Sequence, residues 1–157
     1  MEKQNENFRN HEDLPALEKT LEVFGLRFFS KLTAIAGLYE HFESSEALTL
    51  LVPRDEAFYA LSPGELSRYL SSPEELASLI RRHALPGKLS SEDLSGMAYS
   101  RNMEGGLIPL KLARGTLRVG SACVVDSDIE ASHGIIHTLD SVLRQKDVQK
   151  NQVQEAL

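Results

Sequence analysis

The sequence predicts an α+β domain in which helices come first and mostly antiparallel strands follow. Two patterns lead to this fold class. From Leu17 to Leu38 the apolar residues recur every three or four positions, which is the spacing of a helix that buries one face. After Leu94 the apolar residues alternate within short segments separated by glycine-containing turns, which is typical of antiparallel strands.

The size of the chain predicts one domain with two polar tails. Its 157 residues can form a sizeable core. Both ends are polar and lack periodicity, so we expect an N-terminal tail over 1–14, a single domain over 15–145 and a C-terminal tail over 146–157. Residues 1–14 show no pattern of a secretory signal, so we expect either that the chain stays inside the cell or that such a signal was removed.

The composition argues against two classes of partner. With 23 acidic and 17 basic residues the net charge is −6, so we expect no nucleic acid partner, which would need basic residues to neutralise its phosphates. No stretch approaches the ~20 apolar residues that a membrane-spanning helix needs, so we expect no membrane span. The single cysteine, Cys123, excludes a disulfide within the chain.

Two helices and a strand are predicted in the first third of the chain. The apolar stripe predicts helices over 15–24 and 26–36, with a break at Gly25 and a left-handed end at Gly37. Residues 47–53, ALTLLVP, predict a well-covered strand, because apolar residues dominate it and a proline ends it.

Three helix starts follow, each at a residue that can bind free backbone amides. Asp55 predicts a short turn whose amides its carboxylate caps. Ser62 and Ser72 each stand at an N-cap, followed by proline at the first helical position and glutamate at the third, as in a capping box. The helix that follows Ser72 places His83 on its apolar face, and Pro86-Gly87 ends it.

Five short segments after Leu94 predict an antiparallel meander. They are partly β-branched, and turns such as Gly105-Gly106 and Arg114-Gly115 separate them. The predicted strands cover residues 97–99, 107–112, 116–119, 122–126 and 134–140. The chain therefore divides into a helical half and a strand-rich half.

Three stretches of the sequence carry distinctive motifs. They read TLLVPRDEAFYAL (49–61), LIRRHALPGKLSSEDL (79–94) and DIEASHGIIHTLDSVL (128–143). The first has threonine, apolar residues, proline and an acidic-Glu-Ala-Phe group; the second has histidine before an apolar residue, proline and glycine; the third has glycine, two apolar residues and histidine. In this order and spacing they resemble the signatures of the fasciclin-like domain, an adhesion and interaction module of about this length. The resemblance covers most of the chain, from Leu17 to Leu143.

The resemblance implies a fold and a set of motif residues. It implies a β-wedge of about seven mostly antiparallel strands, with N-terminal and central helices packed on one edge. The positions that match the family's motifs are Thr49, Pro53, Asp55, Glu56, Ala57, Phe58, His83, Pro86, Gly87, Gly134, Ile135, Ile136, His137, Asp140 and Leu143. Most such domains are extracellular, periplasmic or anchored at the cell surface, so the resemblance implies such a location.

The resemblance also implies a partner-binding surface. Family members proposed to bind integrins are thought to use a tyrosine-histidine pair and an aspartate-isoleucine pair near the last signature. His83, Asp128 and Ile129 match these positions and are therefore candidate partner-binding residues. Two positions depart from the family pattern, since Arg82 replaces the tyrosine and His133 replaces an asparagine before the glycine.

The two histidines of ASHGIIHTLD suggest a metal site that strand geometry argues against. On a strand, at about 3.3 Å per residue, His133 and His137 lie ~13 Å apart, whereas a shared ion needs both within about 2.1 Å. We therefore expect no metal. We expect His133 to take a left-handed turn before Gly134, and His83 and His137 to be core histidines bonded to backbone, since the matching family histidines tie the helical segment to the sheet.

Nothing in the sequence supplies catalytic machinery. It has no nucleophile motif, phosphate-binding loop or paired acid and base, so we predict no enzyme, no catalytic residues and no cofactor. We predict a non-enzymatic protein–protein interaction or adhesion module that binds a protein partner or a copy of itself. The alternative is a carrier of a small apolar ligand, such as a lipid or pigment, suggested by the aromatic residues Phe24, Phe28, Phe29, Tyr39 and Phe42.

Overall fold

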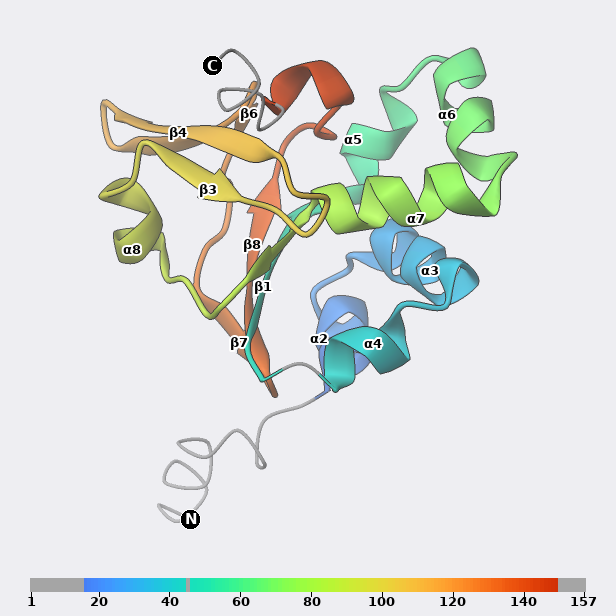
Figure 1. Cartoon of the computed structure of the whole chain (residues 1–157), viewed down its shortest axis with the longest axis horizontal. Coiled ribbons are helices and arrows are strands. Elements are labelled where there is room, and N and C mark those ends of the chain that lie inside the picture. The colour runs from blue at the N-terminus through green and yellow to red at the C-terminus, as the bar shows by residue number, and fades with distance from the viewer. Residues whose placement is uncertain (1–15, 45, 150–157) are drawn as a thin grey trace, which may run out of the picture.

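The helical half of the chain packs beside a wedge of two β-sheets (Figure 1). This computed structural model describes residues 16–44 and 46–149. The N-terminal tail, Pro15 and the end of the C-terminal tail from residue 150 lie outside the described residues.

Three helices open the helical half: α2 (Leu17–Val23), α3 (Arg27–Ala36) and α4 (Tyr39–Glu43). The two predicted glycine breaks are confirmed, since Gly25 and Gly37 are left-handed with φ values of 74° and 72°. The sequence does not predict α4, because five residues carry too little periodic signal.

The central part of the chain holds one strand and three helices: β1 (Leu48–Pro53), α5 (Asp55–Tyr59), α6 (Pro63–Leu70) and α7 (Pro73–Arg82). Ser62 and Ser72 cap α6 and α7 as predicted, because their hydroxyls accept hydrogen bonds from the amides of Glu65 and Glu75. The reciprocal capping box occurs instead at Ser90, before helix α8 (Ser91–Ser95).

Two details of this region differ from the prediction. Asp55 does not cap its own turn, because its carboxylate accepts a 2.9 Å hydrogen bond from the amide of Phe28 and so caps the first turn of α3. Helix α7 ends at Arg82, and the residues before Gly87 form strand β2 (Ala84–Pro86) rather than the last turn of a helix. A strand of three residues is too short for its period to appear in the sequence.

Six further strands follow α8: β3 (Tyr99–Arg101), β4 (Leu107–Ala113), β5 (Thr116–Val119), β6 (Ala122–Cys123), β7 (Ile129–Ala131) and β8 (Gly134–Leu139). Strands β3 to β6 form the predicted antiparallel meander as one sheet, in the order β3-β4-β5-β6. The second sheet has the order β2-β1-β8-β7. The predicted α+β class is therefore confirmed.

The placement of β8 in the meander is wrong, because β8 lies parallel to β1 in the other sheet, with Leu48 opposite Gly134 and Pro53 opposite Leu139. Every residue of both strands is buried, as is usual for parallel strands covered on both faces. A Cβ on Gly134 would lie 2.6 Å from the carbonyl oxygen of Leu48, so this register requires glycine.

The buried residues form two clusters, one on each side of the β1–β8 pair. One cluster joins the helices to this sheet and includes Phe29, Phe58 and Leu79. The other fills the wedge between the two sheets and includes Leu85 and Ile108. The β2-β1-β8-β7 sheet is thus the central layer, with helices on one side and the meander on the other (Figure 1).

Candidate interaction site

The residues of the three motifs bind one another across the fold. The hydroxyl of Thr49 donates a 2.6 Å hydrogen bond to the carbonyl of Gly87 and accepts one of 2.8 Å from the amide of Leu89, which joins the first motif to the second. Asp140 in the third motif accepts a 2.8 Å hydrogen bond from the amide of Cys123. These side chains therefore hold neighbouring segments of the chain in place.

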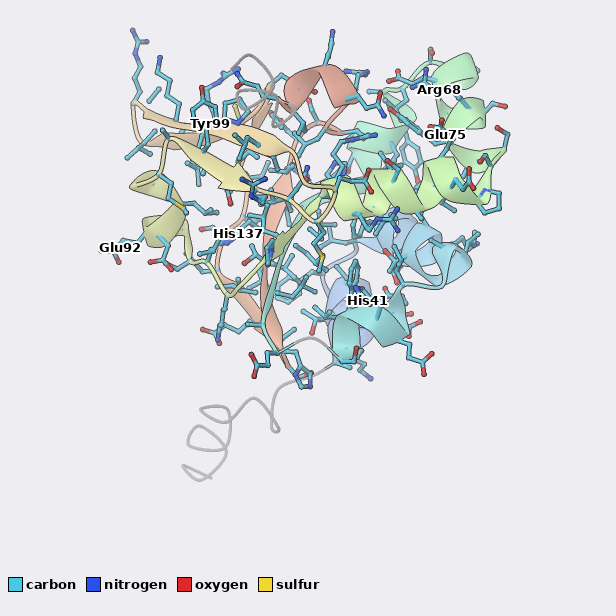
Figure 2. The ribbon with its side chains drawn as sticks, viewed as in Figure 1. His41, Arg68, Glu75, Glu92, Tyr99 and His137 are labelled. Carbon is cyan, nitrogen blue, oxygen red and sulfur yellow. The ribbon has the colours of Figure 1, made fainter. Side chains whose placement is uncertain are left out.

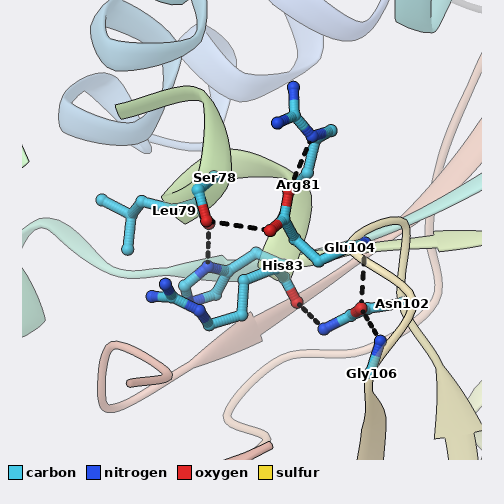
Figure 3. Close-up of polar contacts among 8 residues, drawn as sticks. Ser78, Leu79, Arg81, His83, Asn102, Glu104 and Gly106 are labelled. Atoms are coloured by element: carbon cyan, nitrogen blue, oxygen red, sulfur yellow. Dashed lines mark hydrogen bonds and ion pairs between the residues drawn. The ribbon is translucent and has the colours of Figure 1, made fainter. Parts of the chain in front are cut away.

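His83 ties α7 to the end of the third motif from inside the core. It is completely buried, and its Nδ1 donates to the carbonyl of Leu79 at 2.8 Å (Figure 3). Its Nε2 accepts from the amide of Leu143 at 2.9 Å. Burial lowers the pKa of His83 to about 3, against the opposing effect of the Leu79 hydrogen bond. The predicted core histidine is confirmed, and its ring lies in the interior rather than on the surface where a partner would bind.

Arg82, which stands where the family has tyrosine, is also buried. Its Nη1 donates a 3.1 Å hydrogen bond to the carbonyl of Leu143, beside the amide that His83 binds. The carbonyl of Arg82 accepts from Asn102 Nδ2 at 3.2 Å, and Asn102 Oδ1 accepts from two amides of the next turn (Figure 3). Two neighbouring residues thus hold both backbone groups of Leu143.

His137 in strand β8 also binds backbone groups of other segments with both ring nitrogens. Its Nδ1 accepts a 3.1 Å hydrogen bond from the amide of Asp128, so its Nε2 is the nitrogen that donates, at 2.8 Å, to the carbonyl of Leu89. With both nitrogens engaged, His137 has no lone pair left for a metal ion. His133 has a φ of 67° and takes the left-handed turn that was predicted before Gly134.

Asp128 is the exposed end of this network, and its amide is bound by His137, which is labelled in Figure 2. It adopts a φ of 61°, and its carboxylate accepts hydrogen bonds from the amide and hydroxyl of Ser91, at 2.8 and 2.5 Å. Partial burial alone would raise the pKa of Asp128, but the Ser91 hydrogen bonds and the nearby His137 outweigh it, so the pKa lies below its usual value. The loop before β7 is therefore fixed to both α8 and β8.

A groove of about 230 Å³ lies beside this loop. The α2–α3 turn contributes Phe24, the start of α5 contributes Arg54 and Glu56, and the loop and β7 contribute Asp126 and Ile129. Phe24 is 55% exposed although it is a large apolar side chain. The structure thus brings Asp128 and Ile129 to one surface and leaves His83 out of it.

Sequence reasoning missed Phe24 and Arg54 as neighbours of Ile129. Three segments far apart in the chain build the groove, and no spacing in the sequence connects them. The one local signal is Gly25, whose left-handed conformation follows Phe24, the C-cap residue of α2.

Several of the aromatic residues that suggested a carrier of an apolar ligand pack inside the fold. Phe29 and Phe42 are completely buried, and Phe28 stacks on Phe58 with ring centroids 4.6 Å apart, so these rings fill the core rather than line a ligand cavity.

Residues 16–44 and 46–149 contain no group of three or more His, Cys, Asp or Glu side chains that could hold a metal ion. Over the same residues no helix has both the length and the apolar character to cross a membrane.

Comparison with known proteins finds relatives that share this sequence pattern. The family model described as Fasciclin domain matches residues 25–145. An uncharacterised protein of Synechocystis sp., sll1735, is 33% identical over 119 residues, which cover 74% of this chain and 89% of that protein. Transforming growth factor-beta-induced protein ig-h3 of the pig is 30% identical over 134 residues, which cover 83% of this chain but 20% of that protein.

The fold also matches a solved structure, a FAS1 domain pair from the insect cell adhesion molecule fasciclin I. The TM-score is 0.65 at 17% sequence identity, and the match covers 78% of this chain and 46% of that chain. This likeness confirms the predicted wedge of sheets with helices beside it. Because the family model spans most of the sequence, the chain belongs to the fasciclin-domain family.

Proposed function

We propose that this fasciclin domain is a non-enzymatic protein-interaction module whose contact surface is the loop 126–129 with the groove beside it. The observation that carries the proposal is the state of Asp128, which is exposed and yet held by three hydrogen bonds, from Ser91 and from its own amide to His137. A loop fixed in this way loses little conformational freedom when a partner binds, which favours association.

The composition of this surface supports a protein as the partner. Phe24, which lines the groove, and Val125, which directly precedes loop 126–129, are 55% and 43% exposed. The charged residues Arg54, Glu56 and Asp126 also line the groove. An apolar centre with a polar rim is the usual anatomy of a protein–protein interface. Fasciclin I, which shares the fold, is described as a cell adhesion molecule, and this class of function agrees with such a surface.

The histidines support the non-enzymatic part of the proposal. His83 and His137 each use both ring nitrogens in hydrogen bonds to the backbone, so neither is placed to transfer a proton to a substrate. Their hydrogen bonds instead fix the segments that carry the loop.

The experiment is affinity capture from the native source with the unchanged domain, Phe24→Ser, Val125→Ser and the control Ile35→Ser. Ile35 is 64% exposed on α3 and does not line the groove, so its variant makes an equivalent change elsewhere on the surface. We expect one partner to be lost with the first two variants and kept with the control. If all variants, including Ile35→Ser, capture the partner equally well or all lose it equally, the contact lies elsewhere.

Size-exclusion chromatography of the purified domain distinguishes a foreign partner from a second copy. If the contact is made between copies, the unchanged domain and Ile35→Ser elute as dimers, and Phe24→Ser elutes as a monomer. If the partner is another protein, all three elute as monomers, and the capture experiment alone reports the contact.

A further inference from the structure

We infer a second interaction surface: the outer face of the β3-β4-β5-β6 sheet binds an extended acidic segment of a partner protein. This surface, called the basic face below, consists of Arg101, Lys111, Arg114 and Arg118 together with Tyr99, which is labelled in Figure 2. It shares no residue with the groove, so the inference goes beyond the function proposed above and does not depend on it.

Strand pairing gathers basic residues that the sequence keeps apart. The buried residues Ile108 and Leu110 of β4 face the inner cluster, so the alternate positions of the strand face outward. Lys111 on β4 stands directly opposite Arg118 on β5, and both are exposed. Like charges directly opposite each other destabilise a sheet, so a bound anion would stabilise this face by reducing their repulsion.

The charges of the basic face are not neutralised by any described residue. Arg101 donates to the carbonyl of Gly105, and Nη1 of Arg118 donates to the sulfur of Cys123 at 3.8 Å. No acidic residue occurs between Gly105 and Val125. Basic side chains on other parts of the described surface do form ion pairs with carboxylates, namely Arg54, Arg81, Lys88 and Arg144.

The spacing of the basic face fits an extended chain. Arg101 stands opposite Leu107, which precedes Lys111 by four residues, so Arg101 and Lys111 are ~13 Å apart along the strands. A partner segment with acidic residues at alternate positions repeats every ~6.7 Å, so two repeats span this distance. Tyr99 and Pro109 lie opposite each other between these rows and offer apolar contact to the partner's backbone.

The net charge of the chain favours a short protein segment over a long polyanion. Outside the basic face the chain is acidic, with a net charge of −6 overall. A nucleic acid or a sulfated polysaccharide would extend beyond four basic residues and meet this acidic surface. A short acidic segment contacts only the basic face.

The test measures fluorescence anisotropy of a fluorescein-labelled peptide of alternating glutamate and threonine with the full chain. We expect saturable binding that weakens as salt is added. The double variant Lys111→Glu/Arg118→Glu should lower the affinity about tenfold or more. The control Lys19→Glu/Lys31→Glu changes the net charge equally at exposed positions of α2 and α3 and should alter the affinity by no more than about twofold.

Three outcomes would overturn the inference. The first is no saturable binding at about 1 mM peptide, a concentration at which weak complexes form. The second is an equal loss of affinity in the two double variants, which would mean that overall charge alone attracts the peptide. The third is tight binding of a heparin oligosaccharide without binding of the peptide, which would assign the face to polysaccharides. Unchanged circular dichroism of both double variants establishes that they are folded.

Discussion

The acid sensitivity of folding should report the burial of His83. In the folded chain Nε2 of this ring accepts a hydrogen bond from the amide of Leu143, which a protonated ring cannot do. Burial lowers the pKa of His83 from 6.5 to about 3. The unfolded chain takes up a proton on this ring below its ordinary pKa while the folded chain does not. Acid therefore favours the unfolded state from about pH 6.5 downward, and the effect is complete at about pH 3.

Replacing His83 by glutamine removes this proton uptake. At about pH 5 the unfolded chain has gained about 2 kcal/mol from protonating His83, since each pH unit below the ordinary pKa is worth about 1.4 kcal/mol. The variant also loses buried hydrogen bonds to Leu79 and Leu143, which lowers its free energy of unfolding at about pH 7 by about 2–4 kcal/mol. The free energies of unfolding of the unchanged protein and of His83→Gln should therefore differ by about 2 kcal/mol less at about pH 5 than at about pH 7.

Urea unfolding followed by circular dichroism at several pH values measures this difference. The matched control is His41→Gln, because His41 is exposed on α4. This substitution should lower the free energy of unfolding at about pH 7 less than His83→Gln does, because the side chain lies outside the core. A difference between His83→Gln and the unchanged protein that stays constant with pH would refute the conclusion that His83 is buried in its neutral form.

Three further substitutions test the contacts between the motifs. Gly134→Ala should cost about 2 kcal/mol or more in thermal unfolding, because its Cβ meets the carbonyl of Leu48 at 2.6 Å; a variant as stable as the parent contradicts the β1–β8 register. Thr49→Val keeps the volume but leaves the amide of Leu89 without its partner, so we expect a loss of about 1–2 kcal/mol in urea unfolding, and no loss would contradict the link. Asp128→Asn should cost about 1 kcal/mol at neutral pH. Because the folded pKa of Asp128 is lowered, its contribution is present above the unfolded pKa of 3.8 and is lost as the pH falls through the folded value, so the two proteins should converge in acid; a difference independent of pH would contradict this role.

Helices α2, α3, α6 and α7 and the meander could be predicted because each carries a local signal. Ser62 and Ser72 mark the starts of α6 and α7, and glycines mark the ends of α2 and α3. Strands β2 and β7 have three residues each, which is too short for a period to show. The parallel pairing of β8 with β1 depends on a contact between Leu48 and Gly134, which are far apart in the chain.

The candidate site could be predicted only in part, for a related physical reason. Asp128 and Ile129 lie next to each other in the sequence, so one motif could point to both. The groove also needs Phe24 and Arg54, which only the folded chain brings to Ile129. His83 carries a motif signal because it binds Leu143 inside the core, so a strong motif signal here identifies a residue that stabilises the fold.

A protein partner that contacts the groove beside loop 126–129 should be captured by photo-crosslinking. We place p-benzoylphenylalanine in turn at Phe24, at Val125 and, as the control, at Ile35. All three side chains are exposed, so each variant should fold and present its crosslinker to solvent. We expect a crosslink to one partner from positions 24 and 125 and none from position 35. A crosslink from position 35 alone would contradict this expectation.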